Sequence, residues 1–263
     1  MFQALNTAAS GMMAQEMNLD NIANNLANAS TSGFRSRRLQ FEDLLYQNLV
    51  ASGSAATTQT TVSSGLEVGM GTRSASTEMV NTQGQISQTG NPLDLAIQGN
   101  GFFQIRMPDG TIEYTRAGTF QLDAQGNMVT ADGNPLQPPI SIPLNATNIT
   151  ISKAGVVSAN VPGQNQAQIV GTITLATFAN IGGLNSLGNN LFSPTAASGD
   201  PIIGNPGGNE GLGTLQQGSI ESSNVDVVDE FVQMIEAQRS YEANSQVAKA
   251  ANQMYQDLNG LSQ

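Results

Sequence analysis

The residues that could carry out acid–base chemistry in this chain are two pairs of carboxylates. Glu16 and Asp20 lie four positions apart, and Glu42 and Asp43 are adjacent. Paired carboxylates can hydrolyse a glycosidic bond, which would make the chain a secreted polysaccharide-active β protein. Such a site also needs aromatic rings to hold the sugar, and the 263-residue chain has no Trp and only four Tyr. We therefore expect these carboxylates to be solvated or to face another subunit.

Other kinds of catalytic, cofactor or metal site lack the residue types that they require. The chain contains no Cys and no His, which excludes thiol and imidazole catalysis, disulfides and nearly all zinc sites. The Gly-rich stretch 204–213 lacks the Gly-Lys-Ser/Thr ending of a phosphate-binding loop, so a surface loop is favoured there. We therefore predict a protein that is not an enzyme, with no catalytic residue, no cofactor and no bound metal.

One basic cluster, formed by Arg35, Arg37 and Arg38, lies in a chain whose formal net charge is −11. Nucleic-acid binding requires more positive charge and interleaved aromatic residues, so nucleic acid is excluded as a partner. The three arginines are expected either to pair with the acidic surface of a second copy of the chain or to form an ordinary solvated cluster.

Residues 3–28 have the spacing of an amphipathic helix. Apolar and amide side chains recur there in steps of three and four, as in the seam of a coiled coil. The positions of this seam are Leu5, Ala8, Met12, Gln15, Leu19, Ile22 and Leu26. Gly33 follows where a helix stop is expected.

The C-terminal end predicts a second helix of the same kind. Asn224 or Asp226 can cap it, and Asp229 and Glu230 lie in its first turn, where the helix dipole favours anions. Its seam shifts phase once and consists of Val227, Phe231, Met234, Gln238 and Tyr241, then Val247, Ala251, Met254, Leu258 and Leu261. We expect the two helices to pair. Packing in a polymer is favoured over a self-contained hairpin, since many seam positions are small or polar.

Between the helices the pattern changes to the period of β-strands. Residues 93–97 and 103–107 alternate between apolar and polar side chains, and turn signals follow at 108–110 and 125–127. The predicted fold class is therefore α+β. It combines long N- and C-terminal helices that pair as a coiled-coil-like unit, a central antiparallel β domain and extended linking segments.

The predicted domains follow these changes of pattern. The paired helices take residues 1–30 plus 224–263, the extended linking region takes 31–85 plus 198–223, and the β-rich domain takes 86–197. Residues 48–64 of the linking region are rich in Ser and Thr and too poor in apolar residues for a core of their own. No apolar run reaches five residues and no secretory signal peptide is recognisable, so direct membrane insertion is not expected.

Six segments of the chain resemble, in order, the signatures of the bacterial flagellar basal-body rod and hook protein family. The first reads Ile-Ala-Asn-Asn-Leu-Ala-Asn-Ala-Ser-Thr-Ser-Gly-Phe and contains Asn24, Asn25, Asn28, Gly33 and Phe34. The six segments are residues 22–34, 41–47, 94–103, 114–120, 218–227 and 234–244. The Ser/Thr-rich segment 48–64, followed by Ser-Gly-Leu-Glu-Val-Gly at 64–69, resembles the subunits of the distal rod within that family.

The resemblance implies a structural subunit of the distal rod. Such subunits self-assemble into a rigid helical tube, which transmits motor torque to the hook and forms part of the export channel. The implied location is the flagellar basal body, where the rod crosses the periplasm to the outer membrane. The implied partners are further copies of the chain, the proximal rod proteins, the hook protein, the P-ring and L-ring proteins and the flagellar type III export apparatus. A proximal rod or hook subunit is the alternative within the family.

The resemblance also implies roles for particular residues. Paired terminal helices line the inner wall of the tube, the β domain lies outside, and segment 48–64 reaches neighbouring subunits and holds the tube straight. Asn24, Asn25 and Asn28 are expected to bond backbone groups at the helix end, Gly33 to allow the turn that follows, and Phe34 to anchor the next segment. Subunit packing is expected from Leu5, Met12, Leu19, Ile22, Leu26, Val227, Phe231, Ile235, Tyr241, Val247, Met254 and Leu258.

Overall fold

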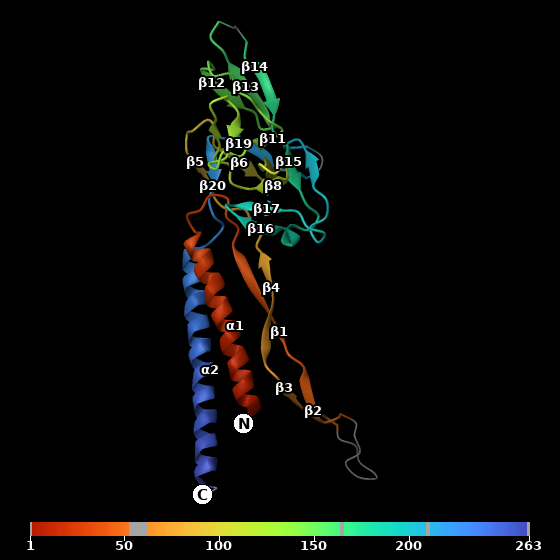
Figure 1. Cartoon of the computed structure of the whole chain (residues 1–263), viewed down its shortest axis with the longest axis vertical. Coiled ribbons are helices and arrows are strands. Elements are labelled where there is room, and N and C mark those ends of the chain that lie inside the picture. The colour runs from red at the N-terminus through yellow and green to blue at the C-terminus, as the bar shows by residue number, and fades with distance from the viewer. Residues whose placement is uncertain (1, 53–62, 164–165, 209–210, 262–263) are drawn as a thin grey trace. The chain divides into compact units, whose positions relative to one another are not determined.

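The computed structural model describes residues 2–52, 63–163, 166–208 and 211–261, and the chain divides into two compact units (Figure 1). The first unit comprises Met1–Leu26, Arg37–Glu78 and Asp226–Gln263. The second comprises Ala27–Ser36 and Met79–Val225. Each unit is therefore assembled from segments that lie far apart in the sequence.

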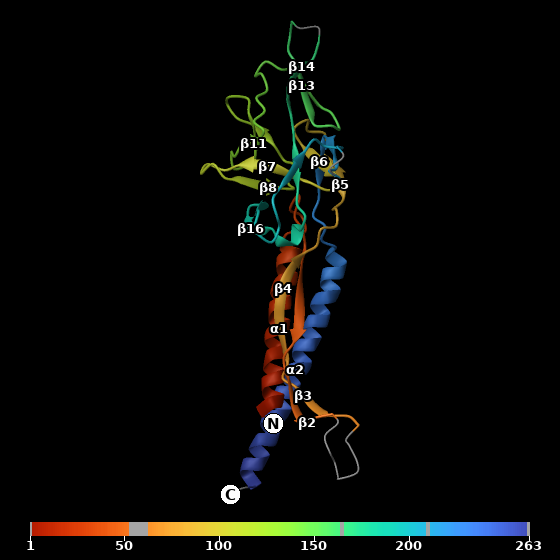
Figure 2. The same cartoon turned by 90° about the vertical axis from the view of Figure 1, so that its right-hand side faces the viewer.

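Two long helices dominate the first unit. Helix α1 spans Phe2–Ala27 and helix α2 spans Val227–Leu261, and they lie side by side and antiparallel (Figures 1 and 2). Asp226 caps α2, since its Oδ1 accepts a hydrogen bond from the backbone N–H of Val228 at 2.9 Å. Both terminal helices that the periodicity predicts are confirmed. Among the described residues, neither helix is long and apolar enough to cross a membrane.

The first unit also contains two antiparallel ribbons in the predicted linking region. Strand β1 (Arg37–Asp43) pairs with β4 (Thr72–Met79), and β2 (Tyr46–Val50) pairs with β3 (Leu66–Gly69). Two-stranded ribbons are marginal alone, and side chains of α1 support the first one. Ser10 Oγ accepts a hydrogen bond from the Thr72 N–H at 3.3 Å. Of the Ser/Thr-rich segment 48–64, positions 48–50 end β2, whereas residues 53–62 lie outside the described residues.

The second unit is an antiparallel β domain, as the alternating pattern predicts. Its largest sheet runs in the order β16-β17-β8-β7-β15-β18, with β11 also paired to β7. Smaller sheets are β12-β13-β14, β9-β10, β6-β19 and β5-β20. The strands are β5 (Ile86–Gln88), β6 (Leu95–Gln98), β7 (Phe102–Arg106), β8 (Ile112–Thr115), β9 (Gln121–Leu122), β10 (Met128–Val129), β11 (Leu136–Gln137), β12 (Asn148–Ile151), β13 (Val156–Asn160), β14 (Gln168–Thr172), β15 (Leu175–Thr177), β16 (Asn185–Gly188), β17 (Leu191–Ser193), β18 (Ile202–Gly204), β19 (Thr214–Gln217) and β20 (Ser219–Glu221), with a 3₁₀ turn at Ile181–Gly183.

A strand that we did not predict ends at the first residue of the Gly-rich stretch 204–213. Residues 202–204 form β18, which pairs with the edge of β15 in the largest sheet. Ile202 and Ile203 supply the β-branched side chains that strands favour, and β15 supplies a free edge that the sequence alone does not reveal.

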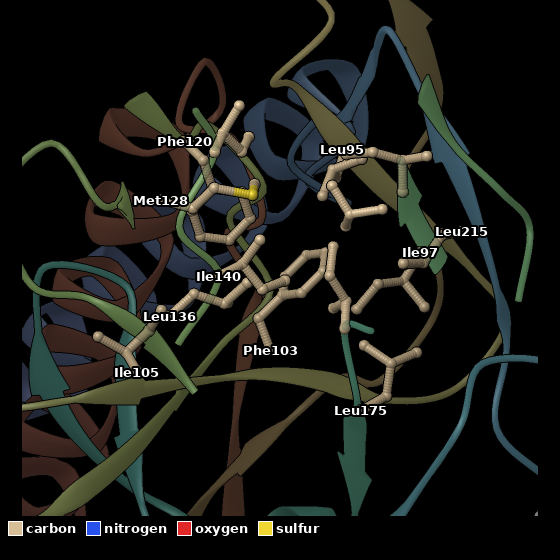
Figure 3. Packing of buried hydrophobic residues seen from close by; sticks show 14 of the residues in the cluster. Leu95, Ile97, Phe103, Ile105, Phe120, Met128, Leu136, Ile140, Leu175 and Leu215 are labelled. Carbon is tan, nitrogen blue, oxygen red and sulfur yellow. The ribbon is translucent and has the colours of Figure 1, made fainter. Parts of the chain in front are cut away.

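The core of the second unit surrounds Phe103 (Figure 3). The Phe103 ring meets Phe120 edge-on, with ring centroids 5.1 Å apart. Phe102, the next residue along β7, points to the opposite side of the sheet and packs with Phe178 and Phe192 in a second cluster. Because both faces of β7 are covered, even Gln104 is buried, and its Nε2 donates to Thr174 Oγ1 at 3.0 Å.

Candidate assembly surface

The contact between α1 and α2 involves small and polar residues. Gly11 and Asn25 of α1 are fourteen residues apart, as are Glu230 and Asn244 of α2, so the two residues of each helix lie on one face of it. Asn25 bonds Glu230, and a Cβ at Gly11 would lie 2.7 Å from Asn244 Nδ2, so the antiparallel register is fixed at two points. At these two points the interface is formed by small and polar residues.

Asn25 joins three elements of the first unit. Its Nδ2 donates to Glu230 Oε1 and to the Arg37 carbonyl, both at 2.9 Å, and its Oδ1 accepts from the Arg37 N–H at 3.0 Å. The same amide thus holds the end of α1, the start of α2 and the start of β1. At the opposite end of the helix pair, the rings of Phe2 and Tyr255 are 5.8 Å apart.

Glu230 is an unusual residue for a helix interface, because it is a buried carboxylate. It is 7% exposed, and its Oε2 has no hydrogen-bond partner among the described residues. Burial raises the pKa of Glu230, the hydrogen bond from Asn25 lowers it, and the nearby charge of Asp229 raises it further. The net effect is a raised pKa, so the neutral acid is favoured more than in an exposed glutamate.

The large apolar side chains of the first half of α2 lie on another face. Val228, Phe231, Val232 and Ile235 follow the i, i+3, i+4, i+7 spacing of an apolar helix face. They are 70%, 48%, 50% and 49% exposed, respectively. At 3.6 residues per turn, Val228 and Val232 lie about 160° from Glu230 and so point away from α1. We call these four residues the α2 stripe.

The structure does not bring the predicted packing residues together as one buried seam. Ile22 is buried, while Leu5, Met12, Leu19 and Leu26 of α1 are half-buried. The described packing residues of α2 are all exposed, and the side chain of Leu258 lies outside the part of the chain that the structure describes. The exposed positions are Val227, Phe231, Ile235, Tyr241, Val247 and Met254. Within one subunit, the interface is filled instead by small and polar residues.

Comparison with known proteins identifies the family. A model described as flagella basal body rod protein matches residues 5–35. Models for the C-terminal part of flagellar basal body rod FlgEFG proteins and for the D1 domain of flagellar hook protein FlgE/F/G match residues 216–261 and 96–159. Flagellar basal-body rod protein FlgG of Buchnera aphidicola is 48% identical over 99% of this chain and 100% of its own length. The chain belongs to the flagellar basal-body rod protein family.

Other rod proteins support the same placement. FlgG of Caulobacter vibrioides is 49% identical over 98% of this chain and 99% of its own length. FlgG of Borreliella burgdorferi is 44% identical over 99% of both chains. By contrast, rod protein FlgF of Mesorhizobium japonicum is 32% identical over 92% of this chain and 90% of its own length. The resemblance to rod and hook proteins that the sequence motifs predict is confirmed, and these FlgG proteins are more similar to the chain than this FlgF.

The rod-protein motif at the end of α1 has a distinct geometry at each predicted position. Asn24 is exposed, Asn25 makes the contacts described above, and Asn28 Oδ1 accepts from Thr31 Oγ1 at 3.2 Å. Gly33 has a φ of 71°, and a Cβ there would lie 2.6 Å from the Ala117 backbone nitrogen. Only glycine fits both restrictions. Phe34 is half-buried.

A buried ionic network in the second unit was not predicted. Glu221 Oε1 lies 3.0 Å from Arg35 Nη2, and Glu221 Oε2 lies 2.6 Å from Arg116 Nε. All three side chains are at most 3% exposed. Arg116 also donates to the carbonyls of Gly101, Ile97 and Gly99. Burial lowers the pKa of Arg35 to about 10, although the charge of Glu221 raises it, and Arg116 lowers it further.

The network corrects our expectation for the arginine cluster. Arg35 is neither solvated nor paired with a second copy, because Glu221 of the same unit neutralises it. Arg38 instead makes an exposed ion pair with Glu78 at 3.0 Å. One sequence signal points to the network. Arg35 directly follows the motif at 22–34, and Arg116 and Glu221 lie inside the motifs at 114–120 and 218–227, in a chain with only 11% charged residues.

Proposed function

We propose that this chain is a structural, non-enzymatic subunit of the flagellar distal rod. It self-assembles into a rigid helical tube that transmits motor torque to the hook and forms part of the export channel. The full-length similarity to proteins named flagellar basal-body rod protein FlgG supports this function. One structural observation supports the assembly step: the helix pair buries small side chains such as Ala8 and Ala237, whereas the large apolar side chains of the α2 stripe stay exposed.

The exposed apolar side chains supply the surface at which subunits pack. Fully burying a Val, Ile or Phe side chain contributes roughly 1.5–3 kcal/mol, so covering several of them stabilises a tube substantially. The twelve packing residues predicted from the sequence, of which Leu5 is the first and Leu258 the last, then make contacts mainly between neighbouring subunits. Such contacts are heterologous and do not close into a ring, so they generate a helix.

The finer organisation of the subunit is part of the same proposal. The helices at 1–30 and 224–263 pair in a coiled-coil-like manner and line the inner wall. The two contacts Asn25–Glu230 and Gly11–Asn244, which lie on one face of each helix, support this pairing. The linking region, with segment 48–64, contacts neighbouring subunits and keeps the tube straight, and the β-rich domain at 86–197 lies outside. In this position it faces the P-ring and L-ring proteins between the periplasm and the outer membrane. The proximal rod and the hook contact the two ends of the tube.

Assembly of the purified chain tests this function. We expect the concentrated full-length protein to form tubes in negative-stain electron micrographs and to sediment as a polymer. The double variant Phe231→Ser, Ile235→Ser should stay monomeric while remaining folded, because both side chains are exposed in the subunit.

The matched control is the double variant Ile202→Ser, Ile203→Ser. These side chains of β18 are 49% and 52% exposed, like those of the test pair, but they lie in the second unit. The control should assemble like the wild type. Equal assembly of both double variants would show that the α2 face does not hold subunits together.

A further inference from the structure

A groove lies beside the start of α1 in the first unit. Its volume is about 440 Å³, and three elements line it: α1, β3 and α2. Most of its walls are small or apolar, namely Ala4, Ala8, Val68, Gly69 and Val247, and Asn244 lies next to them. An open groove of this size and lining suits the insertion of aliphatic side chains.

The groove also holds an unmatched hydrogen-bond donor. Gln3 lines the groove, and its Nε2 is buried with no hydrogen-bond partner among the described residues. A buried amide donor without an acceptor is unfavourable, because the hydrogen bond that water gave it is lost without replacement. The first turn of α1 lies at the same place, and the N-terminal end of a helix dipole favours negative charge. The occupant that fits would therefore bring aliphatic side chains together with a carboxylate.

We propose that the occupant is the α2 stripe of a second copy of this chain. Val228, Val232 and Ile235 provide the aliphatic side chains, and all three are at least 49% exposed. Asp229 and Glu236 flank Val232 on the same side of the helix, three positions before it and four positions after it, and both are exposed. Rotation of the Gln3 side chain toward the groove would bring its buried Nε2 within reach of either carboxylate.

The stripe cannot enter the groove of its own subunit. On α2, the centre of the stripe lies about 14 residues before the Asn244–Val247 wall of the groove, which corresponds to about 20 Å along the rigid helix. The contact therefore joins two different patches on two copies. Such a contact is heterologous and repeats without closing, with successive copies displaced by about 20 Å along the helix axis.

This inference rests on the proposed self-assembly and specifies one of its interfaces. Cysteine cross-linking tests it directly, because the chain has no Cys of its own. One variant carries Val232→Cys in the stripe and the other carries Val247→Cys in the groove, and both positions are about half exposed. With a short bis-maleimide under assembly conditions, a mixture of the two variants should give cross-linked dimers, and neither variant alone should do so. A single chain with both substitutions should give a ladder of multimers.

Two controls distinguish the groove from general contact. Replacing Val232→Cys by Ile169→Cys, at a position 68% exposed on β14, should abolish the cross-linked dimer. Adding Ala4→Trp to the Val247→Cys variant should fill the groove and reduce the yield of cross-linked dimer to that of the Ile169→Cys control. Adding Ala23→Trp instead, at another exposed position on α1, should leave the yield unchanged.

The outcomes separate this inference from the proposed function. If the wild type forms tubes but the mixture links no better than the Ile169→Cys control, the groove-and-stripe contact is wrong and self-assembly stands. Efficient dimers from either single variant alone would indicate a symmetric contact and would also overturn it. If the wild type forms no polymer, both the contact and the proposed function fail.

Discussion

Among single residues, Glu221 has the largest expected effect on stability. Among the residues that the structure describes, it is the only counter-ion of two arginines that are buried with it. We expect Glu221→Ala to lower the free energy of unfolding of the second unit by about 3–5 kcal/mol, because two buried positive charges lose their partner. Urea unfolding followed by the fluorescence of the buried Tyr114 measures the change.

Glu78→Ala is the matched control for that prediction. Glu78 pairs with Arg38 at the same 3.0 Å that separates Glu221 from Arg35, but its side chain is 45% exposed. Solvent screens an exposed pair, which therefore contributes little to stability, so this variant should unfold almost like the wild type. Similar losses in the two variants would mean that the buried network is not what stabilises the second unit.

At the scale of elements, the pairing of α1 with α2 should depend on pH through Glu230. Burial raises the pKa of Glu230 above its usual value of 4.5, so the folded state binds the proton more tightly than the unfolded state. The resulting stabilisation of the helix pair is complete when the pH is below the usual pKa. It is lost as the pH rises through the raised pKa of the folded state. At pH 7 the buried charge therefore weakens the helix pair.

Glu230→Gln removes that charge and retains an oxygen that accepts from Asn25. We expect this variant to stabilise the helix pair by about 1 kcal/mol at pH 7, which is of the order of the penalty for an unsatisfied buried polar group. Below pH 4 we expect no measurable stabilisation, because the Glu230 carboxyl is then neutral. Thermal unfolding followed at 222 nm at both pH values gives the difference. Glu242→Gln, on an exposed part of α2, should have no such effect. An equal gain at both pH values would contradict a role for ionisation.

The elements themselves were largely predictable from the sequence, whereas their contacts were not. Both helices and the antiparallel β domain follow from strong periodicity. The helix interface was missed because Gly11, Asn25 and Asn244 carry almost no hydrophobic signal. The conspicuous residues Phe231 and Ile235 lie on the exposed face instead. In the first unit, the ribbons were expected only as extended segments, since their strands bury little and alternate weakly.

Residues brought together by the tertiary fold were beyond sequence reasoning. Arg35, Arg116 and Glu221 are separated by 81 and 105 positions, and no local pattern links them. Likewise, the groove beside Gln3 depends on β3, whose position next to α1 follows from the folding of the first unit alone. Sequence motifs identified the family correctly, and the geometry then showed which motif residues are buried.

At the scale of the whole molecule, the two units should differ in local stability before assembly. The β domain has a continuous buried core, whereas the helix pair buries few large side chains. In the dilute monomer we expect fast amide hydrogen exchange over residues 1–30 and 225–263 and slow exchange over 90–180. Exchange in the helices should slow when tubes form. Slow exchange throughout the monomer would indicate a self-contained fold, and the polymer mechanism would then have to be abandoned.

The order of strands in the second unit has a consequence for synthesis. Strand β6 pairs with β19, where Leu215 lies opposite Ile97, and β5 pairs with β20. Both partners precede α2 directly, and Leu215 belongs to the main core. During translation, the ribosome must therefore release more than four-fifths of the chain before these pairs form, and such long-range pairing is intrinsically slow. A newly synthesised subunit therefore stays incompletely folded for a prolonged interval, during which it can pass through a narrow channel as an extended chain.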